Sequence, residues 1–158
     1  MKLTTQTTLT AVLLISIVLL LQSCNLTGKE VARIKVTEPS TTENLKIESA
    51  DVELKAGDDI SFWAQMDMRY KKPAKMEFEV HIIKDGENIE KLYLNPLETN
   101  ITMNAKEVTI NNNTKQSFTG KMSSYLITKD GNYTIKTAFF TSENIQLQLL
   151  QADLIIKK

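Results

Sequence analysis

The chain has 158 residues, no formal net charge at pH 7, and 42% hydrophobic against 24% charged residues. This composition excludes an intrinsically disordered chain, which would be less hydrophobic and more strongly charged. It also excludes a protein that holds nucleic acid through a large positive charge, and the length is that of one domain.

The first 23 residues have the pattern of an export signal. Lys2 supplies a positive charge, and an almost continuous apolar run follows over residues 9–21. The run is shorter than the roughly 20 apolar residues that a membrane-spanning helix needs, and polar Gln22 and Ser23 close it. We therefore expect residues 1–23 to be a signal peptide that is removed.

The residues at the end of this signal are Leu21-Gln22-Ser23-Cys24. They resemble the lipobox of bacterial lipoproteins, in which the cysteine is acylated and the signal peptide is cut before it, although Gln22 replaces the small residue more usual there. Cys24 is the only cysteine, so it cannot form an intramolecular disulfide. The resemblance implies lipidation at Cys24; the alternative is an ordinary secretory signal followed by a chance cysteine.

The same resemblance implies a location. Two or more acyl chains hold a protein stably on a membrane, whereas one chain holds it only marginally. Residue 25 is Asn rather than Asp, which by resemblance to lipoproteins of bacteria with two membranes favours the outer membrane. Whether the body faces the periplasm or the outside stays open.

Residues 24–44 are interpreted as the lipidated N-terminus and a tether, because they contain Gly28, Pro39 and a polar run over 40–44. Within them, residues 31–37 alternate between apolar and polar side chains, so this piece is either part of the tether or an edge strand. The folded domain is expected over residues 45–158.

Beyond residue 45 the hydrophobic period is close to two almost everywhere, which is typical of strands with one buried face. Met76, Phe78, Val80 and Ile82 form one such buried set. The predicted strands are 52–54, 60–69, 76–83, 89–94, 101–105 with 108–110, 117–127, 133–141 and 145–156.

Two local features refine this pattern. Asp85-Gly86 separates two predicted strands and suits a tight hairpin turn, because both residues tolerate positive φ. In the last strand the apolar parity changes between Leu149 and Leu150. One extra residue at a β-bulge explains this change, and a helix over residues 146–153 is the alternative.

Asp130-Gly131-Asn132-Tyr133 precedes a strand with Ile135 and Phe139 on the face of the tyrosine. This resembles the tyrosine corner of immunoglobulin-like and fibronectin-like domains, in which the phenol hydroxyl bonds to nearby backbone. The resemblance implies an all-β fold, an antiparallel immunoglobulin-like β-sandwich of about seven strands. A jelly roll or small barrel remains the alternative, and a plain hairpin with an aromatic residue is the alternative for the motif.

No catalytic residue, metal ligand or cofactor is predicted. His81 is the only histidine and shares a face with Glu77 and Glu79, but a catalytic zinc site usually needs three converging protein ligands. No glycine-rich phosphate loop is found. A glycoside hydrolase would have to gather two or more of five carboxylates in one pocket: Asp58, Asp59, Asp67, Glu77 and Glu79.

Three residues are candidates for binding a partner. Trp63 has the parity opposite to Phe62, so it is expected to face outward unless another segment covers it, and Arg69 and Tyr70 lie in a basic cluster with Lys71, Lys72 and Lys75. We expect a non-catalytic, lipid-anchored module of the cell envelope that binds a protein or glycan and no nucleic acid. The alternatives are a hydrolase of envelope polysaccharide and a periplasmic enzyme inhibitor.

Overall fold

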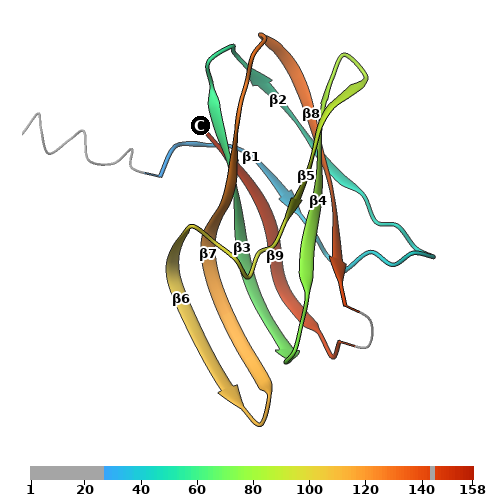
Figure 1. Ribbon diagram of the computed structural model, residues 1–158, viewed down its shortest axis with the longest axis vertical. Helices are drawn as coiled ribbons and strands as arrows, with labels where there is room; N and C mark the ends of the chain where they lie inside the picture. The colour runs from blue at the N-terminus through green and yellow to red at the C-terminus, as the bar shows by residue number, and fades with distance from the viewer. Residues whose placement is uncertain (1–26, 143–144) are drawn as a thin grey trace, which may run out of the picture.

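The computed structural model describes residues 27–142 and 145–158, which form two antiparallel sheets packed face to face (Figure 1). The predicted signal peptide and Cys24 lie outside the described residues. In the described part of the chain no helix is long and apolar enough to cross a membrane. The all-β prediction is confirmed, and these described residues form nine strands rather than about seven.

The five-stranded sheet has the order β1-β9-β3-β7-β6, and the four-stranded sheet has the order β2-β8-β4-β5. The strands of the first are β1 (Glu30–Lys35), β9 (Gln148–Lys157), β3 (Asp59–Lys71), β7 (Asn113–Leu126) and β6 (Ile101–Ile110). Those of the second are β2 (Glu48–Leu54), β8 (Gly131–Thr141), β4 (Met76–Lys84) and β5 (Glu87–Leu94).

The strand order differs from that of an immunoglobulin domain. In such a domain the last two strands share a sheet, whereas here β8 and β9 lie in different sheets, as do β1 and β2. Without β6, the order is that of a jelly roll, in which successive strands repeatedly cross between the two sheets. The sandwich is as predicted, but its connections are not, because alternation shows which residues point inward and not which strands pair.

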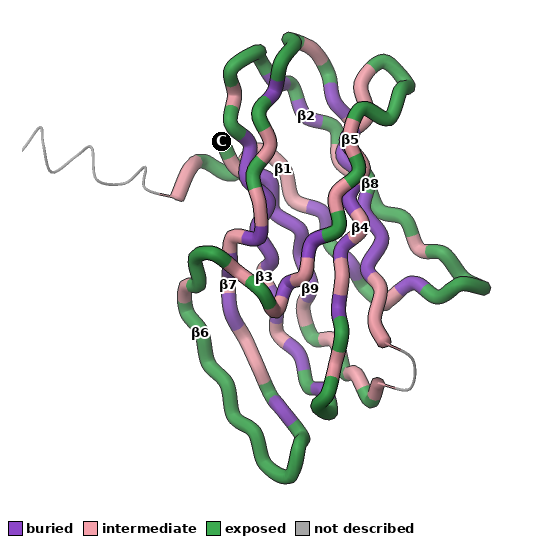
Figure 2. The backbone as a smooth tube through the Cα atoms, in the orientation of Figure 1, coloured by how far each residue is buried: buried purple, intermediate pink, exposed green. Residues whose placement is uncertain are grey.

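The core lies between the two sheets (Figure 2). Phe62 and Met66 on β3 face Phe78 on β4 and Phe139 on β8, all with at most 1% of their surface exposed. The rings of Phe78 and Phe139 are 4.7 Å apart between centroids, which is an aromatic contact distance. The alternation predicted for residues 76–82 therefore marks a true buried face.

Two predictions about local backbone are also confirmed. Asp85 and Gly86 have φ angles of 52° and 83° and join β4 to β5. Along β9, Gln151 pairs with Asp67 and Leu149 pairs with Met68, so Leu150 is the extra residue of a bulge. The last segment is a strand, and the helical alternative is not observed.

The tyrosine corner forms. The buried Tyr133, at the start of β8, donates a hydrogen bond of 2.6 Å from its hydroxyl to the carbonyl of Lys129. This bond closes the turn between β7 and β8 four residues upstream of the ring. The motif therefore predicted a local contact correctly, although the immunoglobulin strand order that it suggested is absent.

Candidate functional site

The first strand, β1, pairs with only part of β9. Residues 30–35 pair with 153–157, and the Val36 N–H then donates to the carbonyl of Ala152 at 2.8 Å. The question left open for residues 31–37 is settled in favour of a strand over residues 30–35, so the folded body begins before residue 45.

The chain turns away from β9 just after Val36. Pro39 has no N–H to continue a ladder, and the Ser40 N–H donates to the carbonyl of Phe139 in the four-stranded sheet at 2.6 Å. β9 nevertheless continues to pair with β3 as far back as Gln148. Within the described residues, Gln148–Gln151 therefore has a strand on one side and none on the side of β1.

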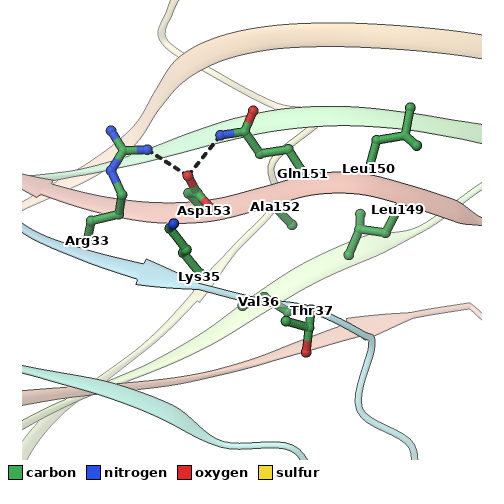
Figure 3. Close-up of a pocket in the computed structure, with 9 residues that line it drawn as sticks. All are labelled: Arg33, Lys35, Val36, Thr37, Leu149, Leu150, Gln151, Ala152 and Asp153. Carbon is green, nitrogen blue, oxygen red and sulfur yellow. Dashed lines mark hydrogen bonds and ion pairs between the residues drawn. The ribbon is translucent and has the colours of Figure 1, made fainter.

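A groove of about 600 Å³ lies at this place (Figure 3). Lys35 is exposed and forms no ion pair within the described part of the chain. The bulge at Leu150 leaves 51% of that apolar side chain exposed. The groove is lined by Arg33, Lys35, Val36 and Thr37 from β1 and the residues after it, and by Leu149, Leu150, Gln151, Ala152 and Asp153 from β9.

A network of hydrogen bonds fixes one wall of the groove, as Figure 3 shows for Arg33, Gln151 and Asp153. The guanidinium of Arg33 donates to Oδ2 of Asp153 at 2.6 Å and to Oε1 of Gln65 at 2.8 Å. The side-chain amide of Gln151 donates to the same Oδ2 at 2.9 Å. Together these bonds tie β1, β9 and β3, and they leave the charge of Asp153 paired.

The other side of Arg33 is held by Glu30, which accepts one hydrogen bond on each carboxylate oxygen, both 2.8 Å. The bond from Arg33 lowers the pKa of Glu30. The hydrogen bond to Glu30, followed by that to Asp153, raises the pKa of Arg33. Since Arg33 is engaged by two carboxylates, Lys35 supplies the free positive charge of the groove.

A second hollow, of about 410 Å³, shares Gln151 with this groove and lies on the outer face of the five-stranded sheet. Asp67, on β3, lies between Gln151 on β9 and Ser117 on β7. Its Oδ1 atom is buried and has no hydrogen-bond partner within the described residues. The outer face of this sheet thus offers a polar surface that continues from the groove.

Trp63 is not an exposed anchor; of the two possibilities that the sequence left open, the structure shows the covered one. Its register places it on the outer face of β3, as predicted, but only 1% of it is exposed. Its indole N–H donates to Oγ of Ser61 at 3.0 Å, and Nζ of Lys157 lies 4.3 Å from the ring centroid. Ile155, its partner on β9, is also buried. The sequence does not show that β9 would place two large side chains beside the ring.

Tyr70 is likewise not a surface residue. Its side chain faces the core with 5% exposure, its hydroxyl donates to Oε1 of Gln116 at 2.8 Å, and burial raises its pKa. Arg69 is exposed. The two residues share a hollow of about 420 Å³ with the exposed Val108 and Ile110 of β6.

The carboxylates considered for hydrolysis do not meet. Asp67 lies on the outer face of the five-stranded sheet, whereas Glu77 and Glu79 lie on the outer face of the four-stranded sheet, on the opposite side of the sandwich. Asp59 is the first residue of β3, and Asp58 immediately precedes it. Of these five carboxylates, only those already close in the sequence lie near one another: Asp58 with Asp59, and Glu77 with Glu79.

Two of these carboxylates are already paired. Oδ2 of Asp58 accepts hydrogen bonds from the Lys55 N–H at 2.9 Å and from Nζ of Lys158 at 3.0 Å. Oε1 of Glu79 contacts Nε2 of His81 at 2.8 Å and Nζ of Lys91 at 2.9 Å. The hydrogen bond with His81, then that with Lys91, lowers the pKa of Glu79.

Sequence reasoning missed Arg33, Lys35, Gln151 and Asp153, which form the walls of the groove. Their polar side chains and strand parity were visible in the sequence, but residues 31–37 and 145–156 are more than a hundred positions apart. The pairing of β1 with β9 brings them together, and no short-range pattern predicts that pairing.

No protein-family model matches this chain, and no curated protein sequence matches it significantly.

Proposed function

We propose that this chain is a lipid-anchored protein of the bacterial cell envelope, and that it acts as a non-catalytic binding or structural module for a protein or glycan partner. The observation that carries the binding role is the edge of β9, which is open among residues 27–142 and 145–158, beside a groove whose Lys35 has no ion-pair partner in the same part of the chain. Exposed main-chain N–H and C=O groups at a sheet edge are ready to pair with another molecule.

The distance between the proposed anchor at Cys24 and the groove favours a groove that a partner can reach. Cys24 is six positions before Glu30, and six residues of fully extended chain span at most roughly 20 Å. The groove lies at the opposite end of β1, about 20 Å further along that strand. An anchor at Cys24 would therefore hold the start of β1 near the membrane and leave the groove away from it.

The anchor is tested by growing the source bacterium, or a bacterial host that processes lipoproteins, with labelled palmitate. We expect the wild-type chain to carry label and to remain with the outer-membrane fraction. The Cys24→Ser variant should carry no label and should leave the membrane. Equal labelling of the two chains would contradict lipidation at Cys24.

The binding role is tested by chemical crosslinking of the tagged mature chain in its native membranes. Lys35→Glu reverses the free charge of the groove. Lys136→Glu is the matched control, because Lys136 is exposed on β8, in the other sheet. We expect a crosslinked species that is reduced by Lys35→Glu and unchanged by Lys136→Glu; equal reduction by both variants would contradict binding at the groove.

A further inference from the structure

We propose that the groove takes an extended peptide segment of a partner protein, which adds to the edge of β9 as a strand in line with β1 and places an acidic side chain beside Lys35. This inference deepens the binding role proposed above and is independent of the lipid anchor. It identifies the partner by its chemistry: a short stretch of alternating acidic and apolar residues in extended conformation.

The backbone argument rests on where β1 ends. The last hydrogen bond on this side of β9 is the one from Val36 to the carbonyl of Ala152, and β9 continues for four further residues, Gln148–Gln151, while still paired to β3. Four residues of strand span about 13 Å. An added strand antiparallel to β9 would lie beside Gln148–Gln151, in line with β1, and its main chain would hydrogen-bond to the N–H and C=O groups of β9 that β1 does not reach.

The side chains beside this edge define what the added strand should carry. Lys35 offers a positive charge, and the carboxylate of Asp153, its cross-strand neighbour, already accepts bonds from Arg33 and Gln151. Leu149 and Leu150 provide apolar surface in the same groove. Because successive side chains of a strand point to opposite faces, acidic and apolar residues in alternation match both requirements.

The free edge of β6 is a less suitable place for such a strand. Three large apolar side chains of β6, those of Ile101, Val108 and Ile110, are exposed, so it is the backbone of β6 that makes this edge less suitable. A register shift between Met103 and Lys106 and the positive φ of Asn104 interrupt its pairing edge. Bulges of this kind protect edges from unwanted pairing. The bulge at Leu150 lies within the proposed edge as well, and it limits the added strand on β9 to a short segment.

The test is an NMR titration of the ¹⁵N-labelled mature chain, residues 24–158 with Cys24→Ser, by three blocked hexapeptides. The first is acetyl-(Val-Glu)₃-amide, the second replaces each Glu by Lys, and the third is the first peptide with all six residue nitrogens methylated, so that neither edge of it can donate a hydrogen bond. We expect saturable shifts of the amides of Lys35, Thr37 and Leu149–Gln151 with the first peptide only. Lys35→Glu should raise the Kd about five- to tenfold, since it replaces an attractive charge by a repulsive one, and Lys136→Glu should leave it unchanged.

Three results would overturn the proposal: no saturable shifts at these amides, shifts centred on Val108–Ile110 of β6, or equal binding of the methylated peptide. If any of these occurs while crosslinking in membranes still depends on Lys35, the peptide mode is refuted and the binding role stands. If neither experiment depends on Lys35, the binding role at the groove is refuted as well.

Discussion

Replacing Arg33 by Met removes the guanidinium that pairs with Asp153 and keeps most of the length of the side chain. The two partners are not equally buried: the side chain of Asp153 is 6% exposed and that of Arg33 is 29% exposed. Arg33→Met therefore leaves the Asp153 carboxylate without its charged partner and nearly shielded from water, with the amide of Gln151 as its remaining side-chain donor. Asp153→Leu instead leaves an arginine that still reaches Glu30 and solvent.

These differences set the expected magnitudes. Removing one partner of a fully buried ion pair costs about 3–5 kcal/mol, and the partial exposure of Arg33 reduces this to about 2–4 kcal/mol for Arg33→Met. For Asp153→Leu we expect about 1–2 kcal/mol, because the stranded arginine remains solvated and paired. In the double variant neither charge is stranded, so its cost should fall below the sum of the single costs by about 1–3 kcal/mol.

Urea unfolding of the wild type, the two single variants and the double variant at pH 7 completes this cycle, with unchanged m-values as the check that only stability changes. The result that would refute the reasoning is additivity of the two substitutions, or an Asp153→Leu variant that is less stable than Arg33→Met. Either would mean that burial of Asp153 does not govern the energetics of this wall of the groove.

Three further predictions concern other parts of the sandwich. Tyr133→Phe should lower the free energy of unfolding by about 1–2 kcal/mol, because it strands a backbone carbonyl, whereas Tyr93→Phe, at a residue 57% exposed, should change it by less than about 0.5 kcal/mol in the same urea assay. Gly120→Ala should lower the free energy of unfolding by about 1–3 kcal/mol, since its Cβ would lie 2.5 Å from Cγ2 of Thr99. Adding Thr99→Gly should recover most of the lost thermal unfolding midpoint; no recovery would mean that this clash is not the cause. The pKa of Glu79 is lowered in the folded state, so the ionised carboxylate stabilises the fold above the unfolded pKa of about 4.5, and this stabilisation is lost as the pH falls through the folded pKa. The difference in free energy of unfolding between wild type and Glu79→Gln should therefore shrink on acidification. A difference that stays constant with pH would contradict this prediction.

Features that depend on neighbouring residues could be predicted from the sequence. The alternation over residues 76–83 identified a buried face, Asp85-Gly86 identified the hairpin, and the parity change at Leu150 identified the bulge. Tyr133 makes the backbone bond that its motif predicts. Each of these depends on backbone geometry within a few residues, which the side chains themselves constrain.

Features that depend on strands far apart could not be predicted. The outward parity of Trp63 was correct, but its burial depends on Ile155 and Lys157, which only the pairing of β3 with β9 brings to it. Tyr70 lies in a sequence-local basic cluster, yet its ring faces the core. For the same reason the groove was not predicted, since it exists only because β1 stops partway along β9.

Backbone amide hydrogen exchange along β9 tests most directly whether this edge is open and able to accept a strand. Asp153–Lys157 pairs with β1 on one side and β3 on the other, so it is the internal control for Gln148–Gln151, which pairs with β3 alone. We expect fast exchange of the amides in Gln148–Gln151 that point away from β3, slow exchange in 153–157, and slowing of the former when acetyl-(Val-Glu)₃-amide is added. Equal protection of both halves in the free protein, or no slowing with the peptide, would contradict the account.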